Sequence, residues 1–553
     1  MRSPFLEGEI YMLKKNQTAE LEIEDFTNEG MGVGRLDGMV VFVPFAAPGD
    51  IMEVLIVKVN ASYAYGKCLR LKRESQYRRK PECPVYGRCG GCRMMHMEYA
   101  FQLELKKKFI RDALTRLGGI ESVPEIEMIG AEPELFYRNK MVYPVGTSKG
   151  RTVCGFYAGR SHDIVPLSGC SLGLRRDDKI ISALLAYMEK YKLVPYDEKS
   201  RKGSVRRLFI RRGRQSGETM VIISAACSRL ASESELARAV LDADSSVTGV
   251  ILNINKKATN LVLGGENRVL YGRGFIRDTL CGNEYEISPH SFYQINPAQT
   301  EILYNKALEY AGIQKTDTVM DIYCGIGTIS LAAAPLAEKV IGIEIVPEAV
   351  TDAKRNALVN GISNADFFAG SAEEIVPRLI ESGSAPGVVI LDPPRKGSDA
   401  ATLTAISAAA PRTIVYVSCN PATLARDVKF LQENGYALEK VTGVDMFPET
   451  VHVETVCQLV LRRSPIHINI DVDVEELVQD KRGSATYEQI KVYVLEHSGL
   501  NVSSLNIAQA KQKCGIIERE NYNKPKAGNA KQPQCPPEKE AAIMEALRHF
   551  VMI

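Results

Sequence analysis

The stretch that decides the fold lies at residues 318–328 and reads TVMDIYCGIGT. Its first four residues are strand-like, and a helical pattern begins where the stretch ends. Between the two lies a turn that contains Gly325 and Gly327. Because glycine has no Cβ, its backbone can approach a ligand closely. The stretch therefore predicts a strand, a tight turn and a helix, with the turn as a candidate binding loop.

Three further strand-like runs lie between helical patterns. They read KVIGIE, GVVILD and TIVYVS at residues 339–344, 387–392 and 413–418. Apolar runs that alternate with helices are typical of a buried, mostly parallel sheet. Residues from about 285 to 463 are therefore predicted to form a Rossmann-like α/β domain.

The residues around the glycine turn indicate its ligand. Glu344 ends the next strand, where a carboxylate can accept hydrogen bonds from both hydroxyls of a ribose. The segment has neither G-x-G-x-x-G nor a P-loop lysine motif, either of which would grasp phosphates. A nucleoside with little phosphate is favoured, and S-adenosylmethionine is such a ligand. A tight turn without a ligand and a solvated strand end are the alternatives.

Two reactive side chains directly follow strands of this sheet. Asp392 begins the run DPPR at residues 392–395, whose prolines stiffen the loop, and Cys419 follows residues 413–418. Ligands of open α/β sheets bind beyond the carboxyl ends of the strands. Both residues are therefore predicted to lie at the binding site, with a buried structural cysteine as the alternative for Cys419.

A cysteine together with a base suits methylation of uracil at C5. C5 is a poor nucleophile, but attack of a thiolate on C6 makes C5 enolate-like, so that it can accept a methyl group. A base must afterwards remove the C5 proton. His452 and Glu454 are two residues apart and share one face if their segment is extended. On spacing alone, either could be the base and either could be an ordinary strand residue.

Five motifs, in order, resemble those of the RNA uracil-5-methyltransferase family. They are SFYQIN, DIYCG, LDPPR, SCNP and HVE at residues 291–296, 321–325, 391–395, 418–421 and 452–454. The resemblance extends over about residues 10 to 463. Five motifs in the same order are far more specific than any one of them.

The resemblance implies roles for six residues. Those that it places in contact with cofactor or substrate are Gln294, Tyr323, Glu344 and Asp392. It also implies that Cys419 is the nucleophile and that Glu454 is the base. Thr328 and Ser371 are left out of the site, because some relatives carry asparagine at those places.

The N-terminal block, from about residue 10 to 72, alternates apolar and polar positions between glycines and prolines. Short strands between turns predict a small β-barrel. The block resembles a TRAM domain, an RNA-binding barrel of the OB type.

A cysteine group opens the next block, a mixed central domain from about residue 73 to 270. Its cysteines have the spacing C-x5-C-x2-C, which by chemistry suits zinc and an iron–sulfur cluster about equally. The possible ligands are Cys83, Cys89 and Cys92, with Cys154 or Cys170 as the fourth. Resemblance to the ribosomal-RNA members of the family implies a [4Fe–4S] cluster with Cys170 as its fourth ligand, and makes His96 incidental.

Positive charge is concentrated in two runs, although the net charge is only +2. Residues 67–80 contain seven basic side chains and one acidic one, and residues 199–214 contain eight basic side chains and no acidic one. Such runs can neutralise RNA phosphates, or they can simply be solvated faces.

Two regions outside the main motifs show helix signals. In the central block a helix is predicted to end at Gly118 and Gly119. In the tail, residues 465–553, Thr486 and Gln489 form a candidate capping box for one helix, and residues 503–513 form a second. Residues 521–537 look like a linker. The tail could contact RNA like a helix-turn-helix, or it could be an appendage.

The sequence as a whole favours one function and two alternatives. No run of about 18 apolar residues and no signal peptide is present, so a cytoplasmic location is expected. The protein is also expected to be a monomer. The barrel and the cysteine group favour 23S ribosomal RNA as the substrate. The alternatives are the T-loop uridine of tRNA, whose enzymes typically lack both features, and a non-enzymatic RNA-binding protein. A DNA cytosine methyltransferase is disfavoured, because Ser418 rather than proline precedes Cys419.

Overall fold

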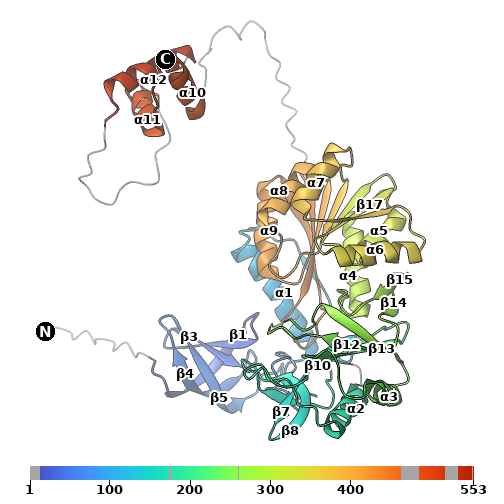
Figure 1. Cartoon of the computed structure of the whole chain (residues 1–553). Coiled ribbons are helices and arrows are strands. Elements are labelled where there is room, and N and C mark those ends of the chain that lie inside the picture. Colours follow the sequence, from blue (N-terminus) through green and yellow to red (C-terminus); the bar gives the residue numbers. More distant parts are fainter. Residues whose placement is uncertain (1–12, 174–176, 259–260, 463–484, 517–533, 551) are drawn as a thin grey trace, which may run out of the picture. The chain divides into compact units, whose positions relative to one another are not determined.

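The computed structural model describes residues 13–173, 177–258, 261–462, 485–516, 534–550 and 552–553 (Figure 1). The chain divides between Arg462 and Arg463 into two compact units. The first unit holds a barrel and two large sheets, and the second holds helices of the tail. No described helix is both long and apolar enough to cross a membrane.

The N-terminal block is a closed five-stranded barrel, as its alternation predicts. Its strands are β1 (Thr18–Phe26), β2 (Met31–Leu36), β3 (Met39–Pro44), β4 (Ile51–Val59) and β5 (Tyr63–Arg73). They close in the order β1-β2-β3-β5-β4. Side chains at every second position, such as Leu21 with Ile23 and Val41 with Val43, fill the interior.

The second sheet has seven strands in the order β13-β12-β11-β10-β7-β8-β9. The strands are β7 (Lys140–Ser148), β8 (Arg151–Tyr157), β9 (Ile164–Pro166), β10 (Val205–Arg212), β11 (Thr219–Ala225), β12 (Val247–Ile254) and β13 (Glu266–Gly272). Helices α2 (Asp177–Lys190) and α3 (Glu233–Ala243) pack on the face that carries Val221 and Ile223. The opposite face, with Met220 and Ile222, joins the core of the catalytic domain.

The third sheet has eight strands in the order β18-β17-β16-β19-β20-β22-β21-β6. They are β6 (Ile126–Ile129), β16 (Thr318–Ile322), β17 (Lys339–Glu344), β18 (Ala365–Ala369), β19 (Val388–Leu391), β20 (Thr413–Ser418), β21 (Tyr436–Val444) and β22 (Glu454–Leu461). Strands β16 to β20 are mutually parallel, as expected, whereas β22 runs antiparallel to both of its neighbours. A separate hairpin consists of β14 (Ile276–Leu280) and β15 (Asn283–Ile287).

Helices cover both faces of the eight-stranded sheet (Figure 1). On one face lie α4 (Pro297–Ala311), α5 (Thr328–Ala333), the 3-10 turn η1 (Ala334–Leu336) and α6 (Pro347–Val359). On the other lie α1 (Tyr99–Arg116), α7 (Ala372–Glu381), α8 (Ala400–Ala409) and α9 (Pro421–Glu433). Neighbouring residues of one strand serve opposite faces: Val319 packs with the first group and Met320 with the second. The sheet is therefore buried on both sides, which explains its nearly continuous apolar runs.

Two elements from the central block belong to this catalytic sheet. Strand β6 pairs in parallel with β21, Ile126 opposite Val441, and α1 packs against α9. The helix expected before Gly118 and Gly119 is thus α1, and it supports the catalytic domain. The catalytic sheet thus includes a strand from the central block, so it does not follow the expected boundaries at about residues 73, 270 and 285. Those domain boundaries stay a prediction.

Several arginines of the second basic run are buried, which neither phosphate binding nor a solvated face predicts. In the second run, Arg212 is buried and bridges Asp177 at 3.1 Å and Asp244 at 2.8 Å. Arg211 is also buried and donates to the carbonyl oxygens of Ser288 and Ser291. They are consecutive residues on β10, which is buried on both faces, so both side chains lie in the interior rather than in solvent.

The C-terminal unit contains three described helices packed around an apolar core. They are α10 (Tyr487–Ser498), α11 (Ser504–Lys513) and α12 (Pro537–His549). The capping box of Thr486 and Gln489 is present, and Gly499 ends α10 with a φ of 66°. The first two helices confirm the prediction, whereas α12 is not foreseen by it. Most of the expected linker, residues 521–537, lies outside the described residues, and its last residue, Pro537, opens α12.

Candidate active site

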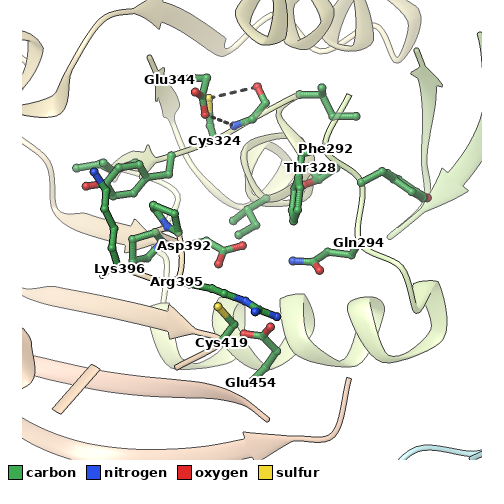
Figure 2. Close-up of a pocket in the computed structure, with 18 of the residues that line it drawn as sticks. Phe292, Gln294, Cys324, Thr328, Glu344, Asp392, Arg395, Lys396, Cys419 and Glu454 are labelled. Carbon is green, nitrogen blue, oxygen red and sulfur yellow. Dashed lines mark hydrogen bonds between the residues drawn. The ribbon is translucent and has the colours of Figure 1, made fainter. Parts of the chain in front are cut away.

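One cavity of about 790 Å³ opens at the carboxyl ends of the parallel strands (Figure 2). All six residues that the sequence assigns to the site line it: Gln294, Tyr323, Glu344, Asp392, Cys419 and Glu454. Its volume lies in the range of sites that enclose a small ligand. The cavity brings together motifs that are up to 160 residues apart in the sequence because the strand ends meet at one edge of the sheet.

The glycine turn forms one wall of the cavity. Tyr323, Gly325 and Gly327 have φ angles of 70°, 56° and 85°, all in the left-handed region. A Cβ on Gly327 would lie 3.1 Å from the ring of Phe367, whereas one on Gly325 would meet nothing within 4 Å. Backbone conformation therefore favours glycine at residues 325 and 327, and packing also restricts residue 327, whereas close approach of a ligand stays a prediction.

Glu344 is tied to this turn. Its carboxylate accepts hydrogen bonds from the backbone N–H groups of Gly325, at 3.1 Å, and Val346, at 2.9 Å. Ile326 and Ile345 provide apolar surface beside it in the cavity. A fixed carboxylate next to an apolar wall can take a ribose and an adenine ring, so the residues present fit S-adenosylmethionine.

Asp392 lies between the glycine turn and Cys419 (Figure 2). Burial, followed by repulsion from Asp321, raises the pKa of Asp392 to about 7. Burial also raises the pKa of Asp321 to about 7, although Ser330 donates a hydrogen bond to it at 2.5 Å. Both carboxyl groups can therefore change protonation state near neutral pH, a property common in active sites.

Cys419 and Glu454 are neighbours because β20 and β22 are antiparallel. Ser418 pairs with Thr455, so the next positions along the two strands bring Cys419 beside Glu454. Figure 2 shows both side chains close to the guanidinium of Arg395. Burial, then the charge of Glu454, raises the pKa of Cys419 to about 11, while Arg395 opposes the shift. Burial, then Asp392, raises the pKa of Glu454 well above its usual value.

His452 lines the same cavity but has a different electrostatic environment. Desolvation, followed by the positive charges of Arg395 and Lys106, lowers its pKa to about 4. The imidazole is therefore neutral at neutral pH. Both candidate bases line the cavity although His452 lies in a loop rather than in a strand, and Glu454 is the one adjacent to Cys419 by strand register.

The sequence interpretation misses several residues that line the cavity. Thr328 and Ser371, which are left out above, both contribute to its wall. Other lining residues without an assigned role are Arg138, Phe292, Phe447 and Thr450. Phe292 lies within the SFYQIN motif and could have been singled out, whereas Arg138 and Phe447 follow no strand-end or motif signal.

The four expected cluster cysteines gather near the cavity. Cys83, Cys92 and Cys170 pack around Met95, Tyr137 and Leu172, and Gly91 and Leu172 border the cavity itself. Burial, then repulsion from Cys170, Cys89 and Cys83, raises the pKa of Cys92. The number and chemistry of these donors fit a thiolate-bound cluster. Nevertheless, no three His, Cys, Asp or Glu side chains within the described part of the chain form a group that could hold a metal ion.

Cys154 and His96 lie in other environments. Cys154 is buried in the core of the seven-stranded sheet, 2% exposed, and burial alone raises its pKa. His96 is buried with its Nδ1 2.5 Å from the hydroxyl of Tyr86, and burial lowers its pKa to about 4. Of the two possible fourth ligands, Cys170 is thus the one near the other three.

Comparison with known proteins agrees with this architecture. A family model described as tRNA (Uracil-5-)-methyltransferase matches residues 264–463, and a TRAM domain model matches residues 13–69. Proteins named uncharacterized RNA methyltransferase from Bacillus cereus and Clostridium tetani are 41% and 45% identical over 444 residues. Each match covers 80% of this chain and 96% of the relative.

A solved structure is also similar over most of the chain. It is the crystal structure of Pyrococcus abyssi tRNA (uracil-54, C5)-methyltransferase in complex with S-adenosyl-L-homocysteine, with 28% identity and a TM-score of 0.64. The match covers 80% of this chain and 100% of that one. The motifs, the cavity and these relatives lead to one conclusion: the chain belongs to the family of S-adenosylmethionine-dependent RNA uracil-5-methyltransferases.

Proposed function

We propose that this protein methylates C5 of a uridine in 23S ribosomal RNA through a covalent bond between Cys419 and C6 of the uracil. The observation that carries the proposal is the convergence of Cys419, Glu454 and Asp392 in the cavity that also contains Glu344. A thiol beside a carboxyl group is the pair that C5 methylation requires.

The proposed reaction begins at Cys419. Its thiol first loses its proton to water, the resulting thiolate bonds to C6, and the electron pair of the C5–C6 double bond moves toward C5 and the C4 carbonyl. S-adenosylmethionine, when bound, supplies a methyl group on a sulfonium. Held by Glu344 and Tyr323, it would deliver the methyl group to C5 and keep the electrons of its broken carbon–sulfur bond as a neutral thioether. The carboxylate form of Glu454 then takes the C5 proton, the electrons of the C5–H bond re-form the double bond, and the C6–sulfur bond breaks with its electrons returning to Cys419 as thiolate.

The electrostatics of the site support this division of roles. Burial, followed by the charge of Glu454, raises the pKa of Cys419 to about 11, and Arg395 opposes this shift, so the guanidinium favours the thiolate form that attacks. The pKa of Glu454 is raised, and a carboxylate with a raised pKa is a stronger base than an exposed one. The pKa of His452 is about 4, which makes it a weak base, so Glu454 is the better candidate.

The cofactor-side residues have proposed roles as well. Glu344 would hold the ribose hydroxyls, with Tyr323 in the adjoining turn. Gln294 and Asp392 face the space between that turn and Cys419 (Figure 2), where the uracil and the methyl group must meet. These roles follow from position in the cavity and from the resemblance.

The tRNA T-loop uridine is the second candidate substrate. Its support is the Pyrococcus protein, which is titled a tRNA methyltransferase and matches over its whole length and four fifths of this chain. A match of that extent weakens the argument that a barrel marks ribosomal RNA enzymes. The choice of 23S RNA therefore depends on the cysteine group and on the resemblance that goes with it.

A direct test is to map 5-methyluridine in RNA from cells with and without the gene. Loss of the mark at one or more 23S positions, restored by the intact gene but not by a Cys419→Ala version, is the expected result. Loss only in tRNA would transfer the proposal to the second candidate. No change in either RNA would contradict both. The intact catalytic pair argues against a non-enzymatic RNA-binding protein.

We also propose that Cys83, Cys89, Cys92 and Cys170 hold a [4Fe–4S] cluster. Support comes from the gathering of these thiols and from the resemblance, whereas the side-chain arrangement described above does not by itself form a ligand set. A thiolate-bound cluster would offset the mutual repulsion of the four sulfurs. A cytoplasmic monomer remains the expectation for the protein as a whole.

A further inference from the structure

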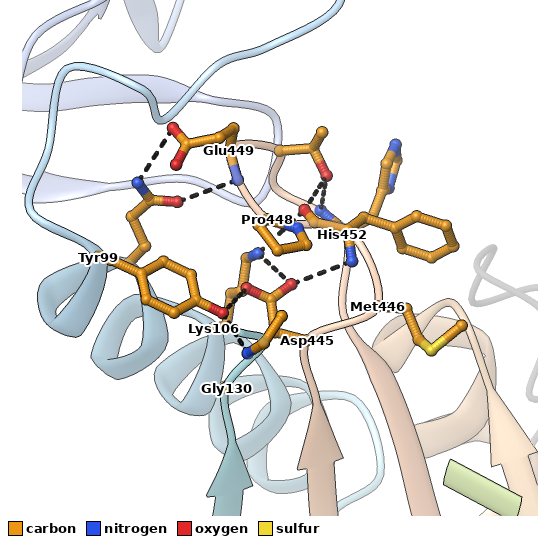
Figure 3. Close-up of polar contacts among 12 residues, drawn as sticks. Tyr99, Lys106, Gly130, Asp445, Met446, Pro448, Glu449 and His452 are labelled. Atoms are coloured by element: carbon orange, nitrogen blue, oxygen red, sulfur yellow. Dashed lines mark hydrogen bonds and ion pairs between the residues drawn. The ribbon is translucent and has the colours of Figure 1, made fainter. Parts of the chain in front are cut away.

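The loop between β21 and β22, residues 445–453, is held by two ion pairs whose carboxylates are fully buried. Figure 3 shows the pair of Lys106 and Asp445. Lys106 Nζ lies 2.6 Å from Asp445 Oδ1, and both side chains are fully buried. Arg79 Nη2 lies 2.5 Å from Glu449 Oε1, and the Glu449 side chain is fully buried. The loop contains His452 and leads directly into Glu454.

Asp445 is bound through both carboxylate oxygens. Oδ1 accepts hydrogen bonds from Lys106 and from the backbone N–H of Phe447, at 3.1 Å. Oδ2 accepts one from the hydroxyl of Tyr99, at 3.0 Å. Lys106 and Tyr99 both come from α1, so this helix fixes the start of the loop.

Glu449 is bound through every polar group it has. Its N–H donates to Gln102 Oε1 at 3.2 Å, and Gln102 Nε2 donates to its carboxylate at 3.3 Å. Its carbonyl oxygen accepts from the N–H groups of Arg93, at 3.0 Å, and Met94, at 3.1 Å. Its φ of 71° is left-handed, a conformation that costs a non-glycine residue free energy and persists only when its surroundings enforce it.

A relay of hydrogen bonds connects Lys106 to the end of the loop. Lys106 Nζ donates to the carbonyl oxygen of Phe447 at 3.3 Å, and the same oxygen accepts from the Thr450 hydroxyl at 2.8 Å. The Thr450 hydroxyl in turn accepts from the N–H of His452 at 3.3 Å. His452 is two residues before Glu454, so displacement of Lys106 would shift the backbone that positions the proposed base.

Stability alone does not explain why this loop is held by buried ion pairs. Well-packed apolar residues often stabilise a core as well as a buried ion pair does, because charges lose their hydration on burial. Buried pairs are sometimes retained because they impose one geometry. Catalysis is sensitive to such geometry, since a misplacement of about 1 Å can reduce a rate about 100-fold.

We infer that Lys106, Asp445, Arg79 and Glu449 are positioning residues, which hold the loop so that Glu454 faces the C5 proton of a uracil bound to Cys419. The inference rests on the proposed function, because it assigns these residues to the proton-removal step. The backbone donors Arg93 and Met94 directly follow Cys92, so the segment that carries the cysteine motif takes part in the same clamp.

The test compares two disruptions with a matched control. Lys106→Met with Asp445→Asn removes one pair without leaving an unpaired buried charge. Arg79→Met breaks the other pair from its partly exposed side, and Arg79→Lys is the conservative variant that should restore it. The control is Arg212→Met with Asp177→Asn and Asp244→Asn, which removes a buried ionic group of the seven-stranded sheet without leaving an unpaired charge and does not line the cavity. All are measured for kcat, KM for RNA, thermal stability and covalent protein–RNA complex at steady state.

The two disruptions should lower kcat by about 10- to 100-fold with KM for RNA changed less than about twofold. They should also accumulate methylated covalent complex, as Glu454→Gln should, while the control and Arg79→Lys should not. If Glu454→Gln accumulates the complex but neither disruption in a folded protein does, the inference is wrong and the proposed function stands. If Glu454→Gln accumulates none, the proposed function fails first. A loss of RNA affinity at unchanged kcat would assign Arg79 to binding and also overturn the inference.

Discussion

The catalytic cavity and the cysteine group differ in what positions their side chains, although both are visible in the sequence as short motifs. Asp392, Cys419 and Glu454 stand at strand ends, where sheet register dictates their proximity. The segment between β5 and α1 carries Cys83, Cys89 and Cys92. It forms isolated β-bridges to other segments but belongs to no strand. A motif at a strand end predicts geometry, whereas a motif in a loop predicts mainly chemistry.

The largest expected effect is at Cys419, which tests the strand-end side of this comparison. Cys419→Ala should reduce methylation by roughly 10⁴-fold or more, as loss of the nucleophile does in other enzymes. Cys457→Ala, on β22 and fully buried, is the matched control and should keep turnover at a modest loss of stability. Methyl incorporation into RNA, measured with labelled cofactor, distinguishes them. Substantial methylation by Cys419→Ala would sink the covalent scheme.

The loop side of the comparison is tested by iron content. Anaerobically purified protein should be brown, with about four irons per chain, and Cys170→Ala should lose the colour. Cys154→Ala is the matched control, because it removes the alternative ligand that lies in the core, and it should keep the iron. Iron analysis and visible absorption provide the measurement. Stoichiometric zinc without iron in the wild-type protein would refute the cluster.

A smaller effect is expected from pH, which tests Cys419, the proposed nucleophile on the strand-end side of the comparison. Thiolate is the attacking species, and the pKa of Cys419 is about 11 in the ligand-free protein. Below that pKa the thiolate fraction rises with pH, so the rate of adduct formation should rise by up to about tenfold per pH unit. Arg395→Met removes the charge that lowers this pKa and should shift the profile to higher pH. Rapid-quench measurement of the adduct checks this, and a flat profile in both proteins would be contrary to it.

Much of the catalytic domain could be predicted from the sequence because its signals are local. The strand at 318–322, the turn after it and the strand-end placement of Asp392 and Cys419 depend on short apolar runs and on the rule that ligands bind at strand ends. The N-cap of Thr486 is equally local. These features require no knowledge of distant contacts.

The features that escape prediction are those that depend on distant pairing. Nothing near Ile126 indicates that β6 extends the catalytic sheet, and nothing near Arg212 indicates that Asp177 and Asp244 neutralise it. The antiparallel β22, which brings Glu454 to Cys419, is likewise a matter of topology. Similarly, the buried pair of Lys106 and Asp445 joins residues 339 positions apart.

The most direct test of the central claim is denaturing electrophoresis of Glu454→Gln after incubation with RNA substrate and labelled S-adenosylmethionine. This variant keeps Cys419 and the cofactor wall, but it lacks the base that resolves the product. The account predicts a protein–RNA band that survives denaturation and carries the labelled methyl group, and that is absent from Cys419→Ala. Full turnover by Glu454→Gln with no such band would contradict the account and make His452 the candidate base.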